Sequence, residues 1–203
     1  MDVTNIAAVA LGIALSACCG FRVFVPMLAG SLAAFFNWYD FAPQMQWLGT
    51  LPALITFGTA SILEIGAYYI PFLDNLLDTI AAPLSVGAGT VLASSILPID
   101  ENMTRWIAAL FTGGIAAGTL NLGTGLLRLL SSKFTAGAGN VVVASTENAA
   151  AVGGSVLSLL APVFAAVIIA VLVIWVIMKM GSKLRRAFIG KSPPAPGSSH
   201  KEV

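Results

Sequence analysis

The stretch LEIGAYYIPFLDNLLDTIAAP, from Leu63 to Pro83, places three carboxylates among apolar residues in a chain with little charge. They are Glu64, Asp74 and Asp78. An ionised side chain at the centre of a bilayer costs about 2.5–3.5 kcal/mol to insert. Carboxylates in such a segment are therefore candidates for function, and the rest of the chain is interpreted outward from them.

The same stretch is echoed 83 positions later, where Glu64 meets Glu147. The other matches are Ala67 with Ala150, Leu76-Leu77 with Leu159-Leu160 and, after a skip of residues 78–81, Ala82-Pro83 with Ala161-Pro162. The second copy lacks both aspartates. The echo predicts two related halves, 1–98 and 103–180, within one transmembrane domain of residues 1–190.

The composition excludes an ordinary soluble domain. Hydrophobic residues make up 58% of the 203 residues and charged residues only 9%, whereas roughly a quarter of a soluble domain is charged. The mean hydropathy is +0.92. Apolar stretches of about 20 residues, long enough to cross a bilayer, recur through the chain. We therefore predict an all-α polytopic membrane protein.

The apolar pattern predicts about six spans. They are 5–36, 48–70, 79–97, 106–130, 141–154 and 155–177, with an amphipathic link over 71–78. The first would be roughly 48 Å long as one straight helix, so we expect it to be tilted or broken. The alternative is two short segments that meet at Gly20-Phe21-Arg22. The fifth is short and polar, and we expect it to be broken.

Glycine and proline mark the expected helix breaks. The candidates are Gly20, Pro26, Pro71, Pro83 and Pro162. Broken or re-entrant segments at the middle of the membrane are typical of secondary transporters built from inverted repeats. Three spans in each half would place the second half upside down relative to the first, so we expect a 3+3 inverted repeat.

Lysine and arginine set the expected orientation. The basic run after Ile177 places the C-terminus in the cytoplasm, and six spans then place the N-terminus there too. The loop 37–46 would lie outside and the loop that holds Lys133 inside. The tail 191–203, KSPPAPGSSHKEV, is rich in proline, glycine and serine and is expected to be a disordered cytoplasmic tail. We expect a bacterial inner membrane protein.

Arg22 lies 17 residues into the first predicted span. Its simplest role is a structural salt bridge, to Glu64 or Glu147. Alternatively, it attracts an anion or gates a cavity. If the first stretch is two short segments, Arg22 instead lies near an interface.

Glu64 and Glu147 occupy matching places in the two expected halves, so pseudo-symmetry could bring both to one axis. Two carboxylates close together in a low dielectric could exchange a proton near neutral pH. The alternative is that each caps a helix N-terminus or pairs with an arginine. Asp74 and Asp78 are one helical turn apart and share a face, which is either a solvated interfacial face or a set of cation ligands.

Three asparagines complete the set of polar candidates. Asn121, Asn140 and Asn148 either line a polar pathway or bridge helices. We include Asn121 and Asn140 in the predicted solute or ion pathway, together with Arg22, Glu64, Asp74, Asp78 and Glu147.

Other function classes find little support. The sequence contains no HExxH motif or catalytic triad, and the single histidine, His200, lies in the tail, so we expect no enzyme activity, no metal and no cofactor. Cys18 and Cys19 are adjacent in an apolar run and are typical of small buried hydrophobes. The net charge of +1 argues against nucleic acid as a partner.

Several motifs in order resemble a known bacterial family. They are GFRVFVP (Gly20, Arg22, Pro26), the run from Glu64 through Pro71 and Asp74 to Asp78, and Arg128 followed by Gly139-Asn140, Glu147 and Pro162. Over residues 8–178 the chain is similar to an uncharacterised integral-membrane family, domain of unknown function four-one-two-six. The resemblance implies a small multi-pass inner-membrane protein without an established activity. Family members often carry a charged pair where Tyr68-Tyr69 stands here.

We expect a transporter or channel for a small solute or ion, coupled to protons through buried carboxylates. Its expected partners are the lipid bilayer and, in a homo-oligomer, further copies of the same chain. The alternatives are a lipid-handling, flippase-like protein, in which Arg22 meets a phosphate head group, and a non-transporting scaffold. A transporter should show a polar cavity lined by Arg22, Glu64 and Glu147. A flippase should show a lateral groove, and a scaffold should show paired charges and no cavity.

Overall fold

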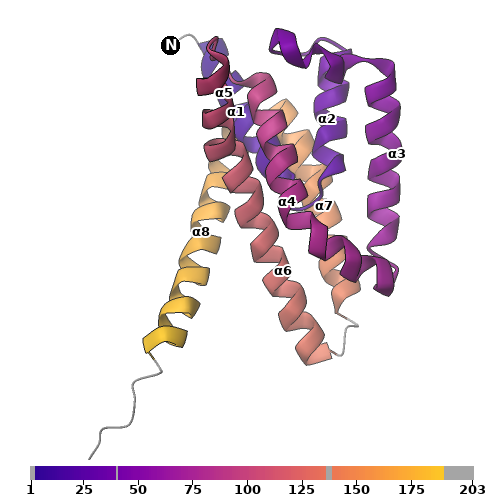
Figure 1. Ribbon diagram of the computed structural model, residues 1–203, viewed down its shortest axis with the longest axis vertical. Helices are drawn as coiled ribbons and strands as arrows, with labels where there is room; N and C mark the ends of the chain where they lie inside the picture. Colours follow the sequence, from indigo (N-terminus) through magenta and orange to yellow (C-terminus); the bar gives the residue numbers. More distant parts are fainter. Residues whose placement is uncertain (1–2, 40, 136–138, 190–203) are drawn as a thin grey trace, which may run out of the picture.

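A computed structural model describes residues 3–39, 41–135 and 139–189, which are all-α, as predicted. The elements are α1 Val3–Cys18, α2 Phe24–Phe35, the 3-10 helix η1 Pro43–Gly49, α3 Leu51–Ala67, α4 Pro71–Ile96, α5 Asn102–Ala109, the π-helical turn η2 Leu110–Gly114, α6 Ile115–Thr135, α7 Asn140–Leu160 and α8 Pro162–Ile189. The predicted tail, 191–203, lies outside the described residues. Figure 1 shows the helices as one bundle.

The bundle is that of a membrane protein. Within the described residues, three helices are long and apolar enough to cross a bilayer: Leu76–Ile96, Asn102–Thr135 and Pro162–Ser182. Shorter apolar helices cover Ile6–Cys18, Phe24–Phe35 and Leu51–Ala67. Large apolar side chains, among them Ile62, Leu129 and Val171, lie exposed on the outside of the bundle, where lipid would cover them.

The first predicted span is two helices rather than one, so the alternative interpretation holds. α1 ends at Cys18 and α2 begins at Phe24. Gly20 lies in the break because the chain there touches α6: a Cβ at Gly20 would lie 2.3 Å from the Ala117 carbonyl oxygen. Pro26 does not break a helix. It lies in the first turn of α2, where a backbone N–H has no acceptor within the helix, so the N–H that proline lacks costs no hydrogen bond.

The chain reverses at this break. Ala7 and Ala8, near the start of α1, line one cavity together with Trp38 and Tyr39, which follow α2. α1 and α2 therefore form a hairpin. Figure 1 places the start of α1 and the last turns of α8 at opposite ends of the long axis. The prediction of six spans with both termini on the same side does not fit this arrangement. The predicted first span, 5–36, is the α1–α2 hairpin, which returns to the end at which it started.

Two other predicted boundaries are wrong. The link 71–78 and the span 79–97 form one helix, α4, which begins at Pro71 and continues through Pro83. The fifth segment is longer than predicted: α7 runs to Leu160, and the chain breaks at Ala161-Pro162 instead of at Ser155. A proline is tolerated inside a membrane helix where neighbouring helices help to satisfy the backbone groups that it frees, and α4 packs along α1, η2 and α6.

α1 is the central helix of the bundle. It contacts α4, α6, α7 and α8, and the side chains of Leu11, Leu15, Cys18 and Cys19 are completely buried. The break that follows Cys18 therefore lies deep in the protein, and Arg22 within it is 1% exposed.

The two echoed glutamates occupy different places in their helices. Glu64 lies in the last turn of α3, which ends at Ala67, whereas Glu147 lies two turns into α7, which begins at Asn140. The sequence echo therefore does not align equivalent positions of α3 and α7. The two carboxylates that it pairs, Glu64 and Glu147, are nevertheless both buried.

Candidate functional site

Arg22 is held by partners from α7. Its Nη1 lies 2.8 Å from Glu147 Oε2, its Nε donates to Asn148 Oδ1 at 2.6 Å, and its Nη2 donates to the Ala144 carbonyl at 3.2 Å. Nη1 also donates to the Phe21 carbonyl. The predicted salt bridge is confirmed, with Glu147 as the partner.

Glu147 joins Arg22 to a second arginine. Arg128, on α6, donates from Nε to Glu147 Oε1 at 3.2 Å and from Nη2 to Glu147 Oε2. Its Nη1 lies 2.8 Å from Asp78 Oδ1 on α4. Arg22, Arg128, Glu147 and Asp78 form the ion-pair cluster, in which two positive and two negative charges balance.

Tyr68 covers both guanidinium groups. The Cζ atom of Arg22 lies 3.6 Å from the centroid of the Tyr68 ring, and that of Arg128 lies 4.3 Å from it. A cation over an aromatic face is stabilised by about 2 kcal/mol when it is desolvated. Tyr68 lies at the end of α3, so the turn between α3 and α4 closes over the cluster.

Glu64 has a different role from Glu147. Its Oε1 accepts from the Val23 N–H at 2.7 Å and its Oε2 from the Phe24 N–H at 2.9 Å. These N–H groups stand at the start of α2, where no carbonyl within the helix is available to them. A carboxylate there also meets the positive end of the helix dipole. Glu64 thus holds the break between α1 and α2, the capping role that the sequence left open.

The cluster varies in exposure. The side chains of Arg22, Glu147 and Arg128 are 5% exposed or less, whereas that of Asp78 is 38% exposed. Asp78 is thus the carboxylate that a solute or an ion would reach first. Asp74 lies one turn earlier on α4, but its side chain is outside the described part of the structure.

The asparagines divide between the cavity and the framework. Asn121 donates to the Gly20 carbonyl at 3.4 Å and lines the cavity beside the cluster. Asn140 accepts from Ser132 at 3.1 Å and thereby links α7 to α6 away from the cavity. Asn148 bridges Arg22 and the Tyr69 hydroxyl. Of these three asparagines, Asn121 alone lines the cavity beside the cluster.

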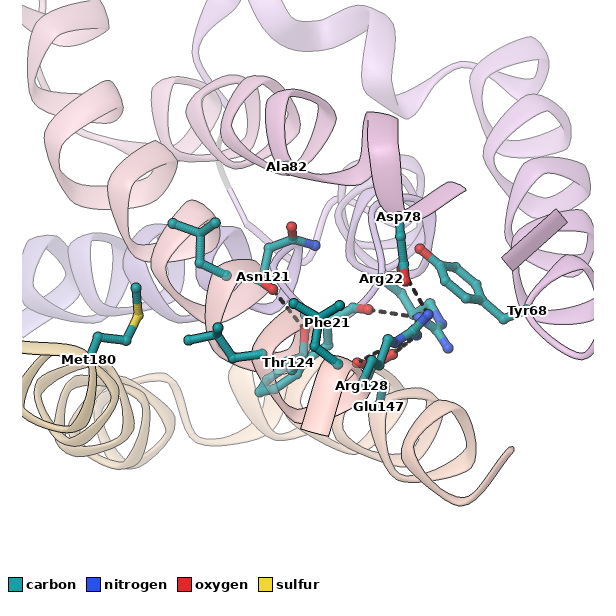
Figure 2. Close-up of a pocket in the computed structure, with 14 residues that line it drawn as sticks. Phe21, Arg22, Tyr68, Asp78, Ala82, Asn121, Thr124, Arg128, Glu147 and Met180 are labelled. Carbon is teal, nitrogen blue, oxygen red and sulfur yellow. Dashed lines mark hydrogen bonds and ion pairs between the residues drawn. The ribbon is translucent and has the colours of Figure 1, made fainter. Parts of the chain in front are cut away.

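A cavity of about 310 Å³ adjoins the ion-pair cluster. Its polar lining comes from Arg22, Tyr68, Asp78, Asn121, Thr124, Arg128 and Glu147, and its other residues are mostly apolar. Figure 2 shows the cluster at one side of this space and Met180, from α8, at the other. Glu64 is not among the lining residues.

The predicted pathway did not include two members of the site, although both were among the residues compared with the family. Arg128 and Tyr68 stand near the ends of predicted spans, where a polar head group usually reaches the interface. A signal was present for Arg128, because Gly125 and Asn121 precede it by three and seven residues, which places all three on the same side of a helix. In the described residues, no group of three histidine, cysteine, aspartate or glutamate side chains could hold a metal ion.

Burial makes the network sensitive to substitution. Charges taken out of water lose hydration, which the attraction between them offsets only when the geometry is good and the hydrogen bonds are complete. Removing one partner leaves an uncompensated buried charge, which typically costs about 3–5 kcal/mol. The cluster therefore holds the break of the α1–α2 hairpin, α4, α6 and α7 in one arrangement.

Comparisons with known proteins place the chain in a family without a known activity. No curated protein and no solved structure matches it. Residues 9–181 match the family described as Domain of unknown function (DUF4126), which covers most of the chain. The chain therefore belongs to the DUF4126 family.

Proposed function

We propose that this protein is a small membrane transporter or channel whose solute passes through the cavity beside the ion-pair cluster. One observation carries the proposal: the cavity lies at the break of a helical hairpin and is lined by paired charges from α4, α6, α7 and the break itself. Buried charges in membrane segments mark pathways for solutes and ions. Discontinuous helices commonly form the sites of transporters.

The cluster offers a way to couple solute to conformation. An ion-pair network can have two arrangements, and a solute that binds one arrangement better shifts the population towards it. Asp78 is the exposed member, so a coupled proton or cation would exchange there. Glu64 instead serves the framework in this scheme, since both of its oxygens accept backbone N–H groups.

The scaffold alternative accounts for the paired charges but gives no role to the cavity. A scaffold gains nothing from leaving about 310 Å³ open beside a desolvated network, because filling a void improves packing. Transport is therefore the stronger proposal.

The arrangement of the bundle and its basic residues support one orientation in the membrane. We place the end of α8 and the loop with Lys133 in the cytoplasm of a bacterial cell, by the excess of lysine and arginine at that end. The start of α1 and the segment 37–50 then lie outside.

Two-sided access tests the proposal without knowledge of the solute. Thr124→Cys places a thiol in the cavity lining, while Gln46→Cys and Lys133→Cys mark the two ends of the bundle. Cys18 and Cys19 are completely buried, so the parent protein is the unlabelled control. In oriented vesicles, a membrane-impermeant thiol reagent should label each end marker from one side and Thr124→Cys from both.

Labelling of Thr124→Cys from one side alone, under every ion and pH condition, would show a closed vestibule and would contradict transport. Lack of labelling from either side would show a sealed cavity and would favour the scaffold.

A further inference from the structure

A second cavity of about 310 Å³ lies between α6 and α8, and its lining is mostly apolar. It shares Phe21, Thr124, Leu126 and Met180 with the cavity beside the ion-pair cluster. The two cavities are therefore neighbours that meet at these four side chains. Their linings are charged on the side of the cluster and apolar on the side of α8.

The apolar end faces the side of the bundle. A Cβ at Gly123 would lie 2.9 Å from Val176 Cγ1, so α6 and α8 touch there. Figure 1 shows that the two helices diverge from this region towards the end of α8. Leu126, Leu127 and Leu130 line the opening and are exposed, so the groove opens towards lipid.

The size of the groove suits a hydrocarbon chain. From Leu120 to Leu130, both of which line it, the groove follows α6 for roughly 15 Å at 1.5 Å per residue. Trp175 and Leu172 form the opposite wall on α8. A small hydrophilic solute would leave these apolar walls without a partner, whereas a lipid chain would cover them.

Positive charge is available at the charged end and at the end of the groove. If Asp78 leaves Arg128, the ion-pair cluster loses one of its two carboxylates, and its charge becomes more positive. An incoming anion can then take the place of Asp78 at Arg128. Lys179 adds a further ammonium to the groove lining, beside Trp175.

We infer that the occupant is an anionic membrane lipid, whose phosphate replaces Asp78 at Arg128 and whose chain lies between α6 and α8. This inference names the solute class and rests on the proposed function. It assigns the head group to Arg128 rather than to Arg22, since Arg128 donates to Asp78, whose side chain is 38% exposed, whereas the carboxylate partner of Arg22 is the buried Glu147.

Trp175 provides the measurement, because it lines the groove. In a variant with Trp38, Trp47 and Trp106 replaced by phenylalanine, Trp175 is the remaining tryptophan. The protein is reconstituted in vesicles that contain brominated phosphatidylglycerol or brominated phosphatidylcholine. We expect brominated phosphatidylglycerol to quench Trp175 more strongly than brominated phosphatidylcholine. The apparent affinity for phosphatidylglycerol should be about fivefold higher, which is the effect expected of one cation near an anionic head group.

Matched variants identify the cause of the preference. Arg128→Gln should abolish most of it, and Asp78→Asn should increase it, because the substitution removes the competing carboxylate. A merely structural Asp78 would not give this increase. Lys133→Gln, a cation at the same end but outside both linings, should leave the preference unchanged. If Arg128→Gln does not fold, Asp78→Asn still decides.

Equal quenching by the two lipids, or a preference that Asp78→Asn lowers, would overturn the inference. Inorganic phosphate is tested separately for protection of Thr124→Cys from the thiol reagent. Protection as strong as that given by phosphatidylglycerol vesicles would show that a free anion suffices, which would also overturn it.

The two proposals fail in different ways. Two-sided labelling of Thr124→Cys without a lipid preference overturns the lipid inference and supports transport of another solute. A lipid preference with one-sided labelling supports the lipid site and contradicts transport.

Discussion

Glu147 is the residue on which the site depends, because both buried arginines donate to it. Arg22 has further partners in Asn148 and the Ala144 carbonyl, and Arg128 has Asp78. The two arginines thus share one carboxylate, and each also has contacts that the other lacks. Changes at single residues should therefore reveal which pairs matter for stability.

Arg22→Ala should destabilise the protein by about 3–5 kcal/mol, because it leaves part of Glu147 unpaired in a buried place. Adding Glu147→Gln should recover part of the loss. Unfolding in detergent, followed by circular dichroism against denaturant, gives the free energies. Arg22→Ala with Glu64→Gln is the control and should recover nothing, since Glu64 binds the backbone of α2. Recovery in the control alone would contradict the assigned pair.

Gly20 is required by close packing against α6. Gly20→Ala would place a methyl group 2.3 Å from the Ala117 carbonyl oxygen, so the break and α6 must separate, and we expect a loss of about 1–3 kcal/mol. Gly66→Ala, in α3, has no atom within 4 Å of the new Cβ and should be neutral or slightly stabilising. Melting temperatures of both variants test this. Equal effects would mean that packing at Gly20 is not the cause.

At the scale of helices, carboxylates outside the ion pairs hold helix starts. Glu64 does so for α2 from a different helix. Glu101 does so locally for α5, accepting from the Met103 N–H at 3.0 Å and from the Thr104 N–H. In both cases the bound N–H groups are the first of a helix and lack partners within it.

Glu64→Ala should destabilise the protein by about 2–6 kcal/mol, because it leaves two buried N–H groups without an acceptor at about 1–3 kcal/mol each. Glu64→Gln should lose less, since its amide oxygen still accepts one hydrogen bond. The same unfolding measurement applies. If Glu64→Gln is as stable as the parent but alters the pH dependence of flux, Glu64 belongs to a proton pathway after all.

The pH dependence of stability should identify the cap at Glu101. Hydrogen bonds from Thr104 and Met103 lower the pKa of Glu101 below its usual range. The ionised form is therefore favoured in the folded state, so this contribution is present above the unfolded pKa and disappears as the pH falls through the lowered pKa. Melting temperatures of the parent and Glu101→Gln should differ at neutral pH and converge in acid. A constant difference would contradict the cap.

For the whole molecule, the hairpin of α1 and α2 determines which ends of the bundle carry the termini. Ala7 and Trp38 line one cavity, so the chain returns to the end at which it started. In the later part of the chain, α4 and α7 run along the bundle in the opposite direction to α6 and α8 (Figure 1), so the ends of these helices alternate between the two sides as the loops were expected to do.

Thiol labelling can test this arrangement directly. Val3→Cys should be labelled from the same side of oriented vesicles as Gln46→Cys and from the opposite side to Lys133→Cys. The physical reason is the reversal at residues 19–23. Labelling of Val3→Cys together with Lys133→Cys would restore a first segment that crosses the membrane and would remove the hairpin.

The sequence determined the class of the protein and most of its buried charges. The low content of charged residues and the long apolar stretches indicated a membrane protein. In lipid, backbone groups must be hydrogen-bonded within the protein, which favours helices. The cost of inserting charge then identified Arg22, Glu64 and Glu147, and all three are buried. The family resemblance was confirmed over residues 9–181.

Only the tertiary structure decided which charges meet. Arg22 could have paired with either glutamate, and the choice of Glu147 depends on α7 packing against α1 while Glu64 reaches the N–H groups of α2. Three other features have the same origin: the hairpin, the unbroken helix through Pro83, and the charged cavity lying next to the apolar one. They depend on contacts between helices far apart in the chain, which local spacing does not encode and which close packing at glycines such as Gly20 and Gly123 selects.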